Sequence, residues 1–197
     1  MDPGNMSMND RPTKPAVLVF AGPNGSGKST VAQNLPVFGT YINADDIKKE
    51  NDLTDIEAAE QAEHLRIALI DKCADFSFET VLSTERNLLL LQNAKEHGYE
   101  VQCIYVLTCD ENINVARVKA RRKAGGHDVP ADKIRARYHR ALALLPKLIE
   151  ICDKIVIYDN TNEPLLIFSK ENSFGKIYPN NNWSEEAISC LLPAGKR

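Results

Sequence analysis

The chain of 197 residues lacks the patterns that mark several protein classes. Its five cysteines form no C-x-x-C pair, which argues against a zinc site or a disulfide framework, and we expect reduced thiols that are mostly buried. No apolar run is long enough to span a bilayer, and no early apolar stretch resembles a signal peptide. The net charge of -3 argues against a general nucleic-acid binder. We therefore expect a cytoplasmic protein with no membrane partner.

The pattern of the chain changes near residue 15. Residues 1–14 are polar and rich in glycine, proline and asparagine, and they predict a flexible leader before one domain over residues 15–197. Ala16 to Gly22 is a continuous apolar run that ends in glycine, which is typical of a strand buried on both faces. Four further strands are predicted over residues 37–44, 76–83, 101–108 and 154–160.

Helical patterns alternate with these strands. Thr54 and Glu57 form a capping signature, and the apolar residues that follow predict one buried stripe. Alternation of this kind predicts an α/β domain with a mostly parallel five-stranded sheet, helices on both faces and a small C-terminal β-hairpin over residues 165–180. The predicted stripe consists of Ile56, Ala59, Ala62, Leu65, Leu69 and Cys73, and the other predicted helices cover residues 28–35, 86–97, 112–123 and 130–149.

A glycine-rich segment follows the first strand and fits G-x-x-x-x-G-K-[ST] at every specified position. Glycines let backbone N–H groups approach a triphosphate, and the helix that follows directs its positive end at the phosphates. This predicts a P-loop NTPase fold that binds ATP, with Lys28 on the β- and γ-phosphates and the Ser29 hydroxyl on Mg²⁺. The predicted ATP-binding residues are Gly22, Pro23, Asn24, Gly25, Ser26, Gly27, Lys28, Ser29 and Thr30.

Two adjacent aspartates close the second predicted strand. In open parallel sheets, ligands bind beyond the carboxyl ends of the strands, so Asp45 or Asp46 is placed to accept the proton of an acceptor hydroxyl. The alternative is that the pair caps a short helix over residues 47–50.

Glu79 lies within an otherwise apolar strand, where an unpaired carboxylate is costly to bury. We expect it to face a wet cleft and to bind metal or substrate, with Thr80 beside it in the substrate site. A solvent-facing position on an edge strand is the alternative.

Arginines concentrate in the segment from residue 117 to residue 140, around a Gly-Gly pair. Transferred phosphate needs permanently charged, forked donors that arrive as a site closes. We predict that Arg121, Arg122 and Arg137 contact phosphate, and that His127 in the turn between them is structural. Solvated basic helix faces are the alternative.

Taken together, these residues resemble the zeta toxin family of small-molecule kinases. The likeness rests, in order, on VFAGPNGSGKST, YINADDI, FSFETVLST, GYEVQCIYVLT, RVKARRKAGGHDVPADKIRARYHRAL and YDN. It implies a P-loop kinase fold, Mg-ATP as cofactor, phosphorylation of the 3′-hydroxyl of UDP-N-acetylglucosamine, and an antitoxin partner. It further implies that Asp45 is the base, that Glu79 is the strand glutamate, and that Arg121 or Arg122 and Arg137 are lid arginines.

One segment departs from the family pattern. Family toxins tend to carry E-G-T-L-R after the third strand, whereas this chain has Glu79-Thr-Val-Leu-Ser83, and Arg86 is the nearest substitute for the arginine. The chain looks most similar to the shorter, stand-alone members. The predicted function is an ATP-dependent kinase of a small-molecule hydroxyl. The alternatives are a kinase of another metabolite, an antibiotic or a nucleic-acid end, and a nucleotide-gated binding module.

Overall fold

The computed structural model describes residues 14–32, 39–123 and 129–194, so residues 1–13 of the predicted leader lie outside the described residues. Its strands are β1 (Ala16–Ala21), β2 (Thr40–Ile42), β3 (Phe76–Thr80), β4 (Glu100–Leu107), β5 (Lys154–Asp159), β6 (Leu165–Glu171) and β7 (Phe174–Ile177). Its helices are α1 (Lys28–Ala32), α2 (Ala44–Asn51), α3 (Asp55–Asp71), α4 (Arg86–Glu96), α5 (Glu111–Lys123), α6 (Ala131–Ile151) and α7 (Glu185–Ser189). The assignment of residues 15–197 to one domain stays a prediction.

All the described strands form one sheet in the order β2-β3-β1-β4-β5-β6-β7. The first five are parallel, as predicted, and β6 and β7 continue the same sheet as antiparallel strands. The predicted five-stranded sheet is therefore extended to seven strands. The hairpin joins the sheet because its Ile167 and Phe168 pack into the main hydrophobic cluster.

Strand β1 lies at the centre of the sheet, between β3 and β4, and all six of its residues are buried. Val17, Val19 and Ala21 belong to a cluster with side chains of α3, α4 and α6, whereas Leu18 and Phe20 pack with Ala32 of α1 on the opposite face. Side chains alternate across a strand, so a central strand covered on both faces needs an unbroken apolar sequence. Helices on both faces of the sheet are confirmed.

Helix α3 begins with the predicted capping box, in which Thr54 and Glu57 satisfy each other's backbone N–H groups. Its predicted buried stripe is wrong at most positions: Ala62 is buried, but Ile56 is 72% and Leu65 is 43% exposed. The buried side instead follows an i, i+4 row. This helix has apolar residues on most of its sides, so periodicity alone does not identify the packed one. The buried row consists of Ala58, Ala62, Arg66 and Ile70.

All five cysteines are free. Only Cys103 and Cys152 are buried, and Cys73, Cys109 and Cys190 are exposed, so the expectation of mostly buried thiols is wrong. The exposed three lie after α3, after β4 and at the end of α7, where the chain leaves the core. None of the described helices is long and apolar enough to cross a membrane.

Candidate active site

The segment between β1 and α1 has a backbone shape that only glycine adopts readily. Gly22, Gly25 and Gly27 have φ angles of 139°, 79° and 94°. A Cβ atom on Gly22 would lie 2.0 Å from the carbonyl oxygen of Val106, and one on Gly27 would lie 2.2 Å from Nδ2 of Asn160. The loop is thus held tightly against its neighbours, with its outer side facing a cleft.

Side chains from distant parts of the chain hold the loop in place by hydrogen bonds. Asn114 Nδ2 donates to the carbonyl oxygen of Asn24 at 2.7 Å, and Asn160 Nδ2 donates to that of Ser26 at 2.7 Å. Arg137 Nη1 donates to Oδ1 of Asn24 at 3.3 Å. Neither Asn114 nor Asn160 was identified as a site residue from the sequence; the position of Asn160 just after a parallel strand was the available signal.

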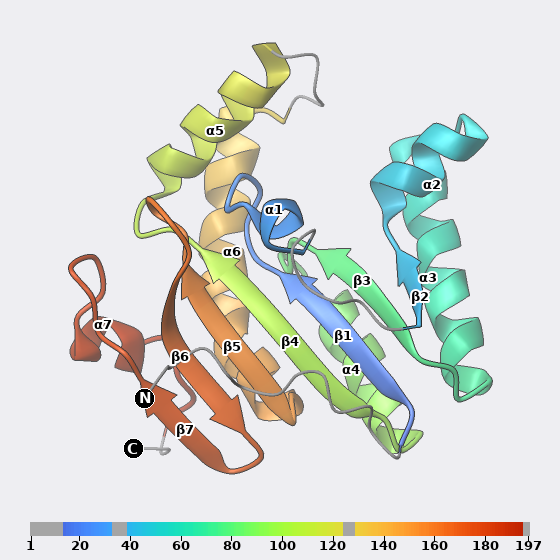
Figure 1. The fold of residues 1–197 in the computed structure, drawn as a ribbon. Coiled ribbons are helices and arrows are strands. Elements are labelled where there is room, and N and C mark those ends of the chain that lie inside the picture. The colour runs from blue at the N-terminus through green and yellow to red at the C-terminus, as the bar shows by residue number, and fades with distance from the viewer. Residues whose placement is uncertain (1–13, 33–38, 124–128, 195–197) are drawn as a thin grey trace.

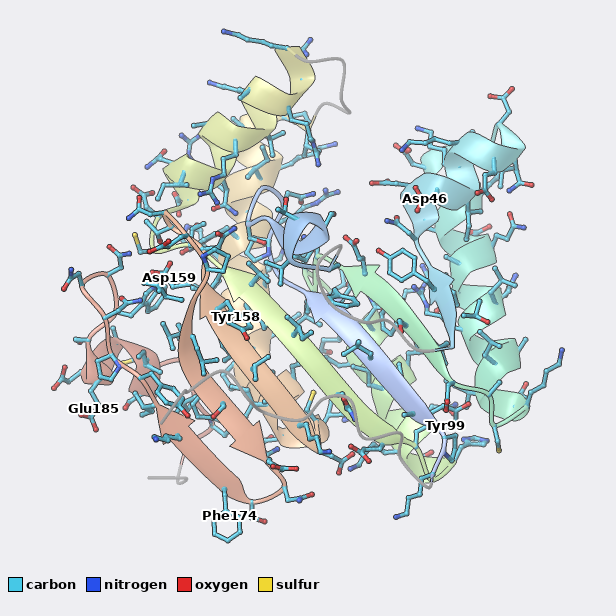
Figure 2. The ribbon with its side chains drawn as sticks, viewed as in Figure 1. Asp46, Tyr99, Tyr158, Asp159, Phe174 and Glu185 are labelled. Atoms are coloured by element: carbon cyan, nitrogen blue, oxygen red, sulfur yellow. The ribbon has the colours of Figure 1, made fainter. Side chains whose placement is uncertain are left out.

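The buried carboxylate of Asp159 positions the segment that carries Asn160 (Figure 2). Its oxygens accept hydrogen bonds from the backbone N–H of Thr161 at 2.9 Å and from Nδ2 of Asn182 at 2.8 Å. Arg117 donates to the carbonyl oxygens of Asn160 and Thr161 at 2.8 and 3.0 Å. Arg117 is therefore engaged in holding this turn.

Lys28 opens α1 and bends back over the loop, where its Nζ donates to the carbonyl oxygen of Pro23 at 3.1 Å. Burial lowers the pKa of Lys28 to about 8. The nearby charge of Arg121 lowers it further, and the carboxylates of Glu79 and Asp45 oppose the shift. A cation held in this way gains a favourable partner when an anion binds the loop.

Ser29 and Glu79 meet at the mouth of the loop, where Ser29 Oγ donates to Oε2 of Glu79 at 3.0 Å. The other carboxylate oxygen accepts a 2.5 Å hydrogen bond from the hydroxyl of Tyr41 on the edge strand β2. Burial raises the pKa of Tyr41, and the hydrogen bond to Glu79 raises it further. Tyr41 thus holds the glutamate from the side opposite Ser29, a role that no sequence pattern indicated.

The two aspartates begin helix α2, but neither is its N-cap. Asn43 occupies that position and accepts from the backbone N–H of Asp45 at 2.9 Å, so the interpretation of the pair as the cap is wrong. Asp45 lines the cleft, whereas Asp46 does not and lies 3.9 Å from Nζ of Lys49. Figure 2 labels Asp46 on α2.

These residues surround one cleft of about 760 Å³ at the carboxyl ends of the parallel strands. In Figure 1, α1 lies at the centre of this end of the sheet, with α2 and α3 on one side and α5 and α6 on the other. The residues that line the cleft are Asn24, Gly25, Gly27, Lys28, Ser29, Thr30, Asn43, Ala44, Asp45, Lys48, Asp55, Ala58, Ala59, Glu79, Thr80, Val81, Ser83, Arg117, Val118, Arg121, Val129, Pro130, Lys133 and Arg137.

Not every predicted residue lines the cleft. Gly22, Pro23 and Ser26 are buried on the inner side of the loop. Arg122 is not among the lining residues, and the guanidinium of Arg86 pairs with the carboxylate of Glu63 on α3. The predicted roles of Arg86 in substrate binding and of Arg122 in phosphate binding therefore stay predictions, and the geometry of the cleft does not support them. His127 and the Gly-Gly pair before it lie outside the described residues.

The oxygen atoms of Ser29 and Glu79 suit a magnesium ion. Mg²⁺ takes oxygen ligands, keeps several waters and usually has one or two protein ligands in addition to substrate phosphates. The hydroxyl and carboxylate oxygens lie 3.0 Å apart beside a phosphate-binding loop, so they can occupy adjacent positions around one ion. No group of three histidine, cysteine or acidic side chains in the described part of the chain forms a site for a metal held by protein alone.

Known proteins share both the sequence pattern and the fold. A family model described as Zeta toxin matches residues 4–172. An uncharacterized protein of Haemophilus influenzae is 34% identical over 127 residues, which span 61% of this chain and 91% of that protein.

Two sets of solved structures have similar folds at low sequence identity. The structure from the PezAT chromosomal toxin-antitoxin system of Streptococcus pneumoniae has a TM-score of 0.59 at 16% identity, over 94% of this chain and 86% of that one. The AvrRxo1-ORF1:AvrRxo1-ORF2 complex has a TM-score of 0.68 at 15% identity, over 92% of this chain and 65% of that one. The same complex has also been solved with ATP, with a TM-score of 0.63.

Proposed function

Because the chain belongs to the zeta toxin family and its fold supports an ATP-dependent kinase, we propose that it transfers the γ-phosphate of ATP to a hydroxyl group of a small molecule. One observation carries the proposal: the glycine loop, Lys28, the Ser29–Glu79 pair and Asp45 all face the same cleft. Phosphoryl transfer needs these parts together, since its catalysis is mostly positioning and neutralisation of charge.

Each part has a distinct task. The loop amides and Lys28 bind the β- and γ-phosphates, and Ser29 and Glu79 would hold Mg²⁺, which neutralises phosphate charge when bound. Asp45 accepts the proton of the acceptor hydroxyl and holds its oxygen in line with the γ-phosphorus. Arg121 and Arg137, on the opposite wall, stabilise the charge on the transferred group.

The family makes UDP-N-acetylglucosamine the first acceptor to test. The direct experiment incubates the protein with Mg-ATP and this sugar nucleotide and looks for a phosphorylated product by mass spectrometry, with Lys28→Ala as the inactive control. Nucleosides and RNA 5′-ends serve as the alternative acceptors. A product that forms with the control variant as well would contradict the assignment of the reaction to this cleft.

A protein partner belongs to the same proposal. The similar structures come from a toxin-antitoxin system and from a two-protein complex, which supports an antitoxin that restrains this chain. Expression in a bacterial host with and without Lys28→Ala measures whether catalysis is harmful. Equal growth with the two forms would contradict a toxic kinase activity.

The lowered pKa of Lys28 predicts a pH dependence of ATP binding. In the free protein this pKa is about 8, and bound phosphates raise it, so binding above pH 8 takes up a proton. The affinity for ATP is therefore full below pH 8 and falls by up to about tenfold per pH unit above it. Calorimetric titration from pH 7 to pH 10 measures this slope. The Lys28→Arg variant, whose charge does not titrate in this range, is expected to give a flat profile, and an equal slope in both proteins would exclude Lys28 as the cause.

Tyr41→Phe tests whether the tyrosine positions Glu79 for the metal. The substitution removes only the hydroxyl, so the carboxylate loses one of its two hydrogen-bond donors. We expect the affinity for Mg²⁺, titrated into the complex with a non-hydrolysable ATP analogue, to fall by about tenfold, with metal-free nucleotide binding unchanged. Tyr178→Phe is the matched control, because this tyrosine follows β7 at the opposite edge of the sheet and does not line the cleft. An unchanged Mg²⁺ affinity would show that the contact has no role in metal binding.

A further inference from the structure

The two walls of the cleft differ in charge. The wall built from α5 and α6 contributes cations, namely Arg117, Arg121, Lys133 and Arg137. The opposite wall, from α2, α3 and the end of β3, contributes the carboxylates of Asp45, Asp55 and Glu79 (Figure 1). The proposed base is on this acidic wall, so the acceptor must bind beside it.

Lys48 is the only cation among the described lining residues of the acidic wall, and it already has a partner. Its Nζ lies 2.6 Å from Oδ1 of Asp55. Arg86, the nearest substitute for the arginine of the family's E-G-T-L-R segment, is bound to Glu63 and does not line the cleft. Among the residues that the structure describes, this wall therefore offers no unpaired cation for a phosphate-bearing acceptor.

The remaining lining residues of this wall are uncharged, and they combine apolar with neutral polar side chains. Ala44, Ala58, Ala59 and Val81 line it together with the neutral polar side chains of Asn43, Thr80 and Ser83. Apolar patches with a few polar groups suit the carbon face and the hydroxyl groups of a sugar-like ring. A diphosphate at the same place would meet carboxylates and uncharged side chains, and no unpaired cation of the described lining residues on this wall would replace its lost hydration.

Resting on the proposed kinase function, we propose that the acceptor is a small polyol that carries no phosphate, with a neutral or amino-substituted ring. Its reactive oxygen forms a bond to the γ-phosphorus, and the bond from that phosphorus to the β–γ bridging oxygen breaks. ADP leaves with the electron pair, and the hydroxyl proton passes to Asp45. The product is a monophosphate ester, and the lid cations serve ATP rather than the acceptor.

Matched acceptors test this inference with the intact protein. N-acetylglucosamine and glucosamine represent phosphate-free polyols, and UDP-N-acetylglucosamine and N-acetylglucosamine 1-phosphate represent their phosphate-bearing counterparts. We expect kcat/KM to be at least about tenfold higher for the phosphate-free compounds. This ratio is what the lack of one charged contact to the phosphate of the other compounds would give. A preference for the phosphate-bearing compounds overturns the inference and leaves the kinase proposal standing.

The Asp55→Asn variant tests the cause of the selectivity. It removes the partner of Lys48 and frees this cation for a phosphate, so we expect the preference for phosphate-free acceptors to shrink by about tenfold. Asp71→Asn, at the other end of α3 and outside the cleft, is expected to keep the preference. An unchanged preference in folded Asp55→Asn, checked by circular dichroism, would contradict this explanation.

A further experiment tests acceptors other than these four compounds without choosing them in advance. The protein is incubated with a small-molecule extract of bacterial cells and ATP labelled with ¹⁸O in the γ-phosphate, and labelled products are identified by mass spectrometry. Labelled monophosphates of polyols support the inference, and labelled products with a second phosphate group overturn it. If no labelled product forms although ATP binds, the kinase proposal itself fails.

Discussion

Replacing Asp45 with asparagine is expected to lower kcat by roughly 10²–10⁴-fold while the affinity for Mg-ATP changes little. Asparagine keeps the size of the side chain but cannot accept the hydroxyl proton or carry the negative charge that orients it. The residue lies in the first turn of α2, on the acceptor side of the cleft, and it is not part of the loop that binds the nucleotide. Product formation with the acceptor measures kcat, and calorimetry measures nucleotide affinity.

The neighbouring aspartate provides a matched control. Asp46 lies in the same first turn of α2 but does not line the cleft, so Asp46→Asn is expected to leave turnover within about threefold of the original protein, in the range of an ordinary surface change. A nucleotide-gated binding module, the alternative from a different functional class, predicts that neither substitution affects function. Equal activity of the two variants would therefore support that alternative over the kinase.

Replacing Lys28 with alanine is expected to lower kcat/KM by roughly 10²–10³-fold, because one charged donor to the β- and γ-phosphates is lost in both the ground state and the transition state. The affinity for ATP falls as well, which distinguishes this variant from Asp45→Asn. Lys49→Ala, an exposed lysine outside the cleft, is the control. Steady-state kinetics and nucleotide titration measure both effects.

Stability separates this functional loss from misfolding. Burial lowers the pKa of Lys28, so the folded protein without nucleotide carries this cation at a cost. Between pH 8 and the usual lysine pKa, the unfolded chain binds more protons than the folded chain, so this cost decreases as the pH rises through that window. Removal of Lys28 is therefore expected to leave the free energy of unfolding at neutral pH equal or higher. A clear fall in that free energy would mean that the lysine is mainly structural.

The parallel core of the fold followed from local sequence. Strand β1 is apolar throughout because both faces are covered, and the glycines at 22, 25 and 27 adopt the positive φ angles that the loop motif requires. The place of the hairpin was harder to predict, because whether β6 pairs with β5 depends on tertiary packing of Ile167 and Phe168. The error at α3 has a similar origin, since its apolar residues lie on more sides than the sheet can cover.

The sequence predicted the residues of the phosphate-binding loop, but it did not predict the side chains that hold this loop in place. Lys28, Ser29 and Asp45 were named from residue type and from their position after a strand, and Glu79 was named as a carboxylate within an apolar strand. The structure brings all four to one cleft. Asn114 and Asn160 act on loop residues 90 and 134 positions away, and no local pattern encodes such a contact. Tyr41 was missed because its aromatic ring fits an edge strand equally well without any function.

The arginines show a further limit of sequence reasoning. Arg117, Arg121 and Arg137 all line the cleft, but the guanidinium of Arg117 is bound to the backbone after β5. Arg117 and Arg121 are four residues apart and lie on the same side of α5, so the residue pattern does not distinguish them, and the contacts of each depend on its position along the helix.

A crystal structure with Mg²⁺ and a non-hydrolysable ATP analogue tests the central claim most directly. We expect the triphosphate to lie in the loop of residues 22–29, with the γ-phosphorus about 5–6 Å from the Asp45 carboxylate. This distance leaves room for one acceptor oxygen in line between them. A nucleotide bound elsewhere, or an Asp45 side chain directed away from the γ-phosphate, would contradict it.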